Sequence, residues 1–222
     1  MASRSLEKGV AAQSSIESEF ATTKGRLSTV QLDVTDENSI RQAANFVDQK
    51  FGHLDVLVNN AASGNCDPDV KTRFQVCMDT NVVGPAVVAA TFRSLLLRAP
   101  NAPYSIYVSS GGGSLTRAAD TTRAKLPVPS NGNAYCVSKA ALNMVMLQDY
   151  VESMSQGAKM KVIAMCPGFV VSNLRGTSEE LRSGWGQAGD PMVSGETILS
   201  IIRGERDGDL GKLVHKDGVY PW

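Results

Sequence analysis

Strand-like and helix-like stretches alternate along this chain, and that alternation limits the possible folds more than any other feature of the sequence. Short apolar runs bounded by turn residues predict buried strands at residues 54–58, 105–108 and 160–165. Apolar residues at helical spacing predict helices at residues 5–20, 36–51, 70–97, 134–154 and 193–202. This is the pattern of an α/β fold with a mostly parallel sheet, and the 222 residues suggest one domain over residues 1–222.

The helix predicted at residues 36–51 has clear signals at both ends. Thr35 is a plausible N-cap, and Asp36 and Glu37 would place negative charge in the first turn. Gly52 would end the helix, because glycine readily adopts the left-handed conformation found there. Three apolar side chains of this helix are expected to face the sheet, namely Ile40, Val47 and Phe51.

Four other segments give weaker signals. Residues 27–34 alternate and predict a strand, and residues 212–215 predict a last strand. Residues 111–133 are rich in Gly, Pro, Thr and Ser, which predicts a long loop of the kind that is functional or mobile. Residues 176–189 show little periodicity and predict a mobile segment.

The composition is that of an ordinary soluble protein. Lys plus Arg balances Asp plus Glu at 22 each, so charge gives no reason to expect nucleic acid or an anionic membrane as a partner. No apolar run reaches the roughly 18 residues of a spanning helix, and residues 1–10 lack the apolar core of a signal peptide. Four scattered cysteines and two histidines predict reduced thiols and no metal site. We expect a cytoplasmic protein.

Tyr135 and Lys139 are four residues apart in a predicted helix, so the two side chains share one face. A phenol with a pKa of about 10 is protonated at neutral pH, and a nearby ammonium group lowers that pKa. The pair could therefore exchange a proton with a substrate at working pH. The alternative, from this spacing alone, is an exposed tyrosine beside a solvated lysine.

Small or polar residues follow three of the predicted strands, at the edge where open α/β sheets bind ligands. The three clusters are Asn59-Asn60-Ala61-Ala62, Ser109-Ser110 and Pro167-Gly168. A serine hydroxyl there could stabilise charge that develops on a carbonyl oxygen, although each cluster alone also fits an ordinary turn. Asn81 lies inside a predicted helix, where it would either open the helix for a water molecule or face solvent.

Together these residues resemble the short-chain dehydrogenase/reductase family, from about Ala2 to the C-terminus. The NNAG element of that family appears as Asn59-Asn60-Ala61-Ala62, with Ala62 in place of the last glycine. Its helical Asn matches Asn81, its YxxxK motif matches Tyr135 and Lys139, and its strand-end serine matches Ser110, with Ser109 as the second candidate. Each element alone is weak, whereas their combination is highly specific.

The resemblance implies a doubly wound, Rossmann-like sheet in three αβα layers, and an NAD(P)-dependent oxidoreductase that reduces a ketone or aldehyde or oxidises the alcohol. Tyr135 would protonate the carbonyl oxygen, and Ser110 would hold and polarise it. Lys139 would lower the pKa of Tyr135 and bind the nicotinamide ribose, and Asn81 would keep a water molecule for proton relay.

The resemblance also implies a set of cofactor-binding residues. These are Arg4, Asp33, Asn59, Ala61, Tyr135, Lys139, Pro167, Gly168, Val170 and Ser172. Asp33 matches the aspartate beside the adenine ring, and Ser172 replaces the threonine that follows the PG element in the family. Arg4 stands where a basic residue favours a 2′-phosphate, which predicts NADP rather than NAD; the alternative is a solvated arginine.

The sequence departs from the family at its start, because no TGxxxGxG turn occurs and Gly9 and Gly25 are isolated. That turn and the following helix hold the pyrophosphate in the family, so we expect a fold that lacks its first strand and helix. The strands on either side would then each expose an unpaired edge. For these 222 residues we expect weak cofactor binding. Two alternatives to an enzyme remain: a non-catalytic binding or partner subunit, and a fragment that folds poorly alone.

Two further expectations come from the resemblance. The long gap between Ser110 and Tyr135 is similar to the carbonyl-reductase branch, in which an insertion, here residues 116–133, shapes the substrate pocket. Apolar residues on more than one face of the helices predicted at residues 70–97 and 134–154 indicate a homodimer or homotetramer. The apolar residues that suggest this are Val87, Val88, Phe92 and Leu95.

Overall fold

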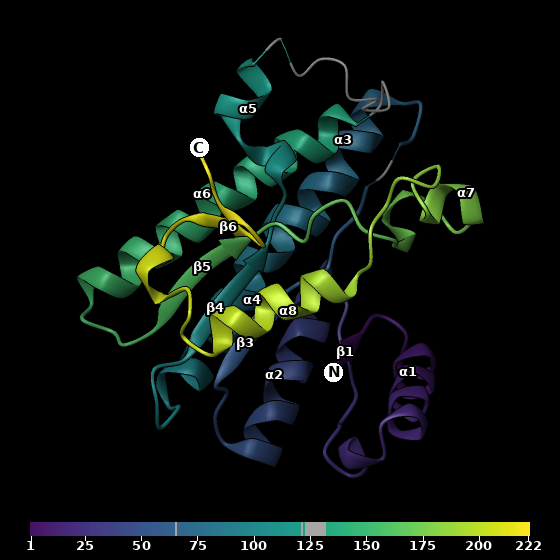
Figure 1. The fold of residues 1–222 in the computed structure, drawn as a ribbon. Coiled ribbons are helices and arrows are strands. Elements are labelled where there is room, and N and C mark those ends of the chain that lie inside the picture. The colour runs from purple at the N-terminus through teal and green to yellow at the C-terminus, as the bar shows by residue number, and fades with distance from the viewer. Residues whose placement is uncertain (65, 121, 123–131) are drawn as a thin grey trace.

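The computed structural model describes residues 1–64, 66–120, 122 and 132–222, and within them the strands form two sheets (Figure 1). The larger sheet has the order β3-β4-β5-β6-β7, in which β3 to β6 are parallel and β7 is antiparallel to β6. Its strands are β3 (Val56–Asn59), β4 (Tyr104–Val108), β5 (Lys161–Met165), β6 (Leu213–His215) and β7 (Gly218–Tyr220). The prediction of a mostly parallel, Rossmann-like sheet flanked by helices is confirmed.

The smaller sheet is a parallel pair made by β1 (Ala2–Ser3) and β2 (Val30–Gln31), joined through helix α1 (Leu6–Glu19). Among the described strands, β1 pairs only with β2, and β3 pairs only with β4. One edge of β1 and one edge of β3 therefore have no strand partner among the described residues.

Helices cover both faces of the larger sheet. The long helices are α2 (Glu37–Phe51), α3 (Val70–Met78), α4 (Gly84–Leu97), α6 (Asn133–Ser155) and α8 (Met192–Ile202), and the short ones are α5 (Leu115–Ala119) and α7 (Glu179–Arg182). Side chains of β4 alternate between the faces, so that Tyr107 packs with Leu142 and Met146 of α6 while Ile106 packs with Ile201 of α8. This alternation explains why β4 is apolar at nearly every position.

Several details differ from the sequence-based expectations. The N-cap of α2 is Asp36 rather than Thr35, because the Asp36 carboxylate accepts from the backbone N–H of Asn38. Ile40 is buried and Val47 packs beside it, but Phe51 is 51% exposed because it lies at the last turn, beyond the sheet. The strand expected at residues 27–34 is limited to Val30–Gln31.

The irregular segments hold more structure than the composition predicts. The first part of the expected loop 111–133 forms a 3₁₀ turn at Gly111–Gly113 and then α5, and residues 121 and 123–131 lie outside the described residues. Helix α7 lies within residues 176–189. The strand β7 has no counterpart in the predictions, since three residues are too few to establish an alternating pattern.

The helix predicted at residues 70–97 is continuous but irregular. It consists of α3, a π-helical turn at Asp79–Val83 and α4. By length and composition, Val70–Leu97 is also the one described helix that could cross a membrane. Its apolar residues have a simpler explanation in this fold, because Val88, Phe92 and Leu95 pack against α2 in the core. These residues do not form the exposed apolar face that the sequence suggested.

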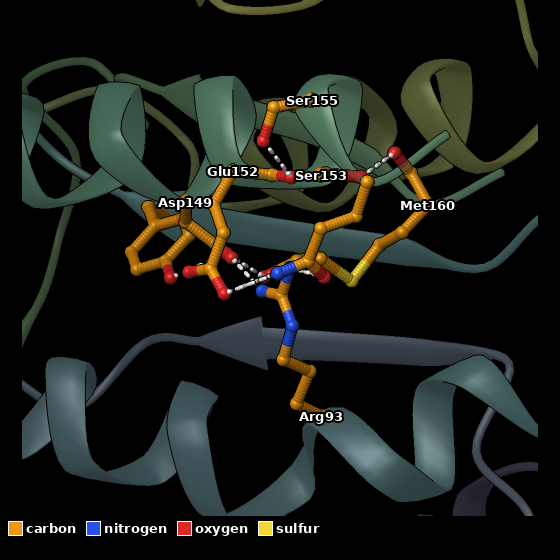
Figure 2. A network of polar contacts seen from close by, with 9 residues as sticks. Arg93, Asp149, Glu152, Ser153, Ser155 and Met160 are labelled. Carbon is orange, nitrogen blue, oxygen red and sulfur yellow. Dashed lines mark hydrogen bonds and ion pairs between the residues drawn. The ribbon is translucent and has the colours of Figure 1, made fainter. Parts of the chain in front are cut away.

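A polar network joins α4 to α6 above β4 (Figure 2). Arg93 of α4 reaches across to Asp149 at 2.8 Å and Glu152 at 3.5 Å, both on α6. The Tyr107 hydroxyl donates to the same Asp149 carboxylate at 2.8 Å. Desolvation and the neighbouring carboxylate raise the pKa of Tyr107 well above its usual value. The network fixes α6, which carries Tyr135 and Lys139, against the sheet.

Candidate active site

Polar residues from separate parts of the chain meet where β3, β4 and β5 end. Ser109 and Ser110 follow β4, Cys166 follows β5, and Asn59 is the last residue of β3. The first two turns of α6 cover this edge, since α6 packs against both β5 and the turn Gly111–Gly113. Parallel register brings these strand ends to the same side of the sheet.

The Ser110 side chain lies close enough to the Tyr135 phenol to lower its pKa. The Ser110 hydroxyl accepts from the backbone N–H of Gly112 at 3.0 Å, so it caps the turn Gly111–Gly113. Burial raises the pKa of Tyr135 to about 12, and the Ser110 hydroxyl acts in the opposite direction. The phenol therefore carries its proton at neutral pH, as a proton donor must.

Lys139 is 1% exposed, and its ammonium nitrogen donates to the backbone oxygen of Val108 at 2.8 Å. Burial lowers the pKa of Lys139 to about 8. The expected lowering of the Tyr135 pKa by Lys139 is not seen: the ammonium nitrogen is engaged with the strand carbonyl and lies 5.6 Å from the centre of the phenol ring. Burial of Tyr135 then outweighs the other influences on its pKa.

Asn81 is fully buried in the π-helical turn, so the possibility that it faces solvent is wrong. Its amide nitrogen donates to the Ser63 carbonyl at 2.9 Å and to the Ser138 hydroxyl at 2.8 Å, and its oxygen accepts from the Ser63 N–H at 2.7 Å. Ser138 in turn donates to the Tyr135 carbonyl at 2.7 Å. Asn81 therefore connects the loop after β3 to the turn of α6 that carries Tyr135.

Ser109 faces the interior, in contrast to Ser110. It is 1% exposed, and its hydroxyl hydrogen-bonds the Asn143 side chain and the Lys139 carbonyl. Asn143 also donates to the Gly113 carbonyl at 3.2 Å. Of the two serines that follow β4, Ser109 is therefore held in the interior, and Ser110 is the one whose side chain influences the pKa of Tyr135.

Asn59 is 7% exposed, and its side-chain nitrogen has no hydrogen-bond partner among the described residues. A buried donor without a partner costs free energy, so this position suits a polar group supplied by a bound molecule. A groove of about 480 Å³ begins three residues further on, between residues 62–64, 66 and 67 on one side and residues 173–176 on the other. Its wall includes Ser63, the residue held by Asn81, and Ala61 is exposed beside it.

The segment after β5 forms the opposite side of this groove. Pro167 accepts from the Ser194 hydroxyl at 2.9 Å, and Gly168 adopts a left-handed φ of 83°, which favours glycine. The Val170 and Ser172 backbones pair with Gly189 and Arg182. Of the implied cofactor-binding residues in this segment, Val170 and Ser172 are only half-buried and Gly168 is exposed.

Arg175 fastens this segment, a role that the sequence did not reveal. Its guanidinium group donates to the carbonyls of Val170, Leu181 and Arg182 at 2.8–3.0 Å and lies 4.5 Å from the centre of the Phe169 ring. Only its contacts in the structure reveal this role. The same is true of Asn143 and Cys166. The Cys166 sulfur accepts from the Gly111 N–H at 3.2 Å.

Arg4 and Asp33 lie together at the ends of β1 and β2. Arg4 is exposed. The pKa of Asp33 is lowered mainly by hydrogen bonds from the backbone and side chain of Thr35, and to a smaller extent by the charge of Arg4. These two residues therefore form a polar end of the smaller sheet, whereas Tyr135 lies on α6 beside the larger sheet.

The comparisons with known proteins agree with this architecture. Residues 1–182 match the family model described as short chain dehydrogenase. The short-chain dehydrogenase/reductase tropE of Talaromyces stipitatus is 36% identical over 97% of this chain and 84% of its own length. The short-chain dehydrogenase anuI of Penicillium roqueforti is 33% identical over 79% of this chain and 69% of its own length.

Solved structures resemble the fold as well. The NADPH-bound carbonyl reductase from chicken fatty liver superposes with a TM-score of 0.79 at 24% identity, covering 100% of this chain and 86% of that chain. The carbonyl reductase Sniffer of D. melanogaster gives a TM-score of 0.73 at 20% identity, with coverage of 100% and 86%. At these identities the likeness concerns the fold alone.

Proposed function

This chain belongs to the short-chain dehydrogenase family, and we propose that it is an oxidoreductase that reduces a ketone or aldehyde, or oxidises the alcohol, with a nicotinamide dinucleotide. The observation that carries the proposal is that Ser110, Tyr135 and the buried Lys139 come together at the carboxyl edge of the sheet. A protonated phenol and a second hydroxyl lie near each other there. A carbonyl oxygen at that point would be within reach of both groups.

In the direction of reduction, Tyr135 donates its phenolic proton to the carbonyl oxygen as negative charge develops there. Ser110 holds the same oxygen by a hydrogen bond and limits its movement. The Lys139 ammonium nitrogen, 5.6 Å from the centre of the Tyr135 ring, would bind the nicotinamide ribose. Asn81 holds the loop at Ser63 against α6 and so keeps the site closed on that side.

The dinucleotide, when bound, supplies or accepts the hydride. The residues on this edge suit such a group, because Asn59 has an unpaired buried donor and Lys139 is a buried ammonium. We propose that Asn59, Ala61, Tyr135, Lys139, Pro167, Gly168, Val170 and Ser172 surround its nicotinamide end. Arg4 and Asp33 would flank its adenosine end.

We propose NADP rather than NAD as the preferred cofactor. The exposed guanidinium of Arg4 is free to turn toward a 2′-phosphate, which only NADP carries. The chicken fatty liver carbonyl reductase with the same fold was solved with NADPH bound, which is consistent with this preference.

We also propose that the chain forms a homodimer or homotetramer through α4 and α6. Exposed apolar side chains lie on these helices and on the π-helical turn before α4. They are Val83, Leu97, Val137, Met144, Val151 and Met154, each 47–59% exposed. Light scattering at working concentration tests this, and a monomer would contradict it.

A direct assay tests the proposed activity. The purified chain is mixed with NADPH and a panel of ketones and aldehydes, the loss of NADPH absorbance is followed, and the alcohol is identified. The double variant Tyr135→Phe, Lys139→Met serves as the control for background oxidation. Carbonyl-dependent turnover that the double variant lacks would support the proposal. Equal rates for both proteins would favour a non-catalytic binding subunit instead.

A further inference from the structure

The last three residues of the chain contact the segment that follows Ser110. The Ser114 hydroxyl donates to the Pro221 carbonyl at 2.5 Å. The backbone N–H of Thr116 donates to the Trp222 oxygen at 2.9 Å, and the Thr116 hydroxyl donates to the same oxygen. These contacts join positions more than 100 residues apart and fasten the start of α5 to the C-terminal residues, whose end lies beside α5 in Figure 1.

Tyr220 adds further contacts between the C-terminal residues and the turn Gly111–Gly113. A Cβ atom placed on Gly111 would lie 3.0 Å from the Tyr220 ring, so the ring and the glycine backbone are in close contact. The guanidinium carbon of Arg117 lies 4.2 Å from the centre of the same ring, and the His215 ring stacks on it at 4.1 Å. The Tyr220 ring is therefore held by β6 and α5 while it presses on the residue next to Ser110.

The opposite side of the same turn is in contact with α6. A Cβ atom on Gly113 would lie 2.6 Å from the backbone carbon of Lys139, which leaves no space for movement in that direction. Asn143 donates to the Gly113 carbonyl, and the Gly111 N–H donates to the Cys166 sulfur. The turn Gly111–Gly113 is thus enclosed between α6 and Tyr220.

The direction of the Ser110 hydroxyl depends on this turn, because the hydroxyl accepts from the Gly112 N–H at 3.0 Å. A rotation of Gly111 would move the Gly112 N–H away and release the hydroxyl. We propose that the C-terminal residues Tyr220–Trp222 act as a positioning element for Ser110, with the Tyr220 ring as its main contact. This inference rests on the proposed function, since it assigns Ser110 to the carbonyl oxygen.

The test compares four proteins: wild type, Tyr220→Ala, Tyr220→Phe and the neighbouring control Val219→Ala. Val219 lies on the same strand, is 39% exposed, and has no hydrogen bond or ring contact with the turn among the described residues, so its truncation tests perturbation of the strand alone. For Tyr220→Ala we expect kcat to fall about tenfold to 100-fold, as for a misplaced catalytic group, with the Kd for NADPH unchanged. Tyr220→Phe keeps the ring and should restore most of the activity.

Hydrogen exchange at residues 111–117 gives a readout that does not depend on activity. We expect faster exchange in Tyr220→Ala and in Thr116→Val, and wild-type exchange in Val219→Ala. Thr116 is exposed, so loss of its hydroxyl should leave the fold intact even if Tyr220→Ala does not fold.

The outcomes separate two failures. If no carbonyl is turned over by wild type but exchange at residues 111–117 rises in the variants, the proposed function is wrong and the positioning claim falls with it, although the attachment itself is real. If wild type is active and Tyr220→Ala retains full kcat, or if Tyr220→Phe is as impaired as Tyr220→Ala, the positioning role of the ring is wrong.

Discussion

Lys139 places its ammonium nitrogen 2.8 Å from the carbonyl oxygen of Val108, two residues before Ser110. This contact joins the helix that carries Tyr135 to the strand that Ser110 follows. It also gives a buried ammonium a strong acceptor, which offsets part of the cost of removing it from water. Lys139 therefore helps to hold Tyr135 near Ser110, in addition to any chemical role of its ammonium group.

Replacement of Tyr135 by Phe should reduce turnover by about 10²–10⁴-fold, the range for loss of a general acid. The Kd for NADPH should remain nearly unchanged, because the phenol acts on the carbonyl oxygen. Steady-state kinetics and fluorescence titration measure the two effects. The control is Tyr150→Phe on the same helix, whose ring packs on Gly211 and which should stay active.

The stability of the protein should rise with pH above about 8 because of Lys139. Burial lowers its folded-state pKa to about 8 from an ordinary value of 10.5. Between these values the unfolded chain binds one more proton than the folded chain, so the free energy of unfolding increases with pH. The slope should be at most about 1.4 kcal/mol per pH unit and should be absent below pH 8.

Chemical denaturation of wild type and Lys139→Met across this pH window measures the effect. The difference in free energy of unfolding between the two proteins should grow in favour of wild type as pH rises. A difference that stays constant from pH 8 to 10.5 would show that the ammonium is not destabilised by burial. In the proposed enzyme, Lys139→Met should also impair both turnover and cofactor binding.

Asn81→Ala should lower the free energy of unfolding by about 2–4 kcal/mol, because it leaves buried groups of Ser63 and Ser138 unpaired. Urea denaturation checks this value. Asn45→Ala on the exposed face of α2 is the matched control and should change stability by less than about 0.5 kcal/mol. Equal effects for the two variants would contradict the structural role assigned to Asn81.

Arg4→Ala should weaken binding of NADPH much more than binding of NADH, since only NADPH carries the 2′-phosphate. The ratio of the two dissociation constants is the quantity to measure, because it cancels general damage to the site. The same comparison with 2′,5′-ADP and 5′-AMP examines the adenosine end alone. An unchanged ratio would leave Arg4 as a solvated side chain without a role in cofactor choice.

Asp149→Ala should destabilise the protein by about 2–4 kcal/mol, because Arg93 and the Tyr107 hydroxyl lose a largely buried carboxylate. The exposed pair Arg98–Asp48 provides the contrast, since both side chains are 50% exposed. Asp48→Ala should cost below about 1 kcal/mol. Thermal denaturation of both variants gives the comparison.

Much of the fold could be predicted because local patterns determine it. Alternation of apolar runs and helical spacing placed β3, β4, β5, α1, α2, α6 and α8 within a few residues of their observed bounds. Short elements escaped prediction: β7 and α7 have three and four residues, which is below the length at which periodicity is informative. The end of α2 at Phe51 and its stop at Gly52 were predicted correctly, but Phe51 was expected to face the sheet and is exposed instead.

The sequence by itself determined that Tyr135 and Lys139 share a helix face, since four residues make about one helical turn. It could not decide between Ser109 and Ser110, because neighbouring residues of an extended strand point in opposite directions and only packing fixes which direction faces the cleft. In the tertiary structure the Ser109 hydroxyl hydrogen-bonds Asn143 in the interior, and Asn81 is buried against Ser138. The tertiary structure also brought Tyr220 onto Gly111, a contact between residues 109 positions apart that no local pattern encodes.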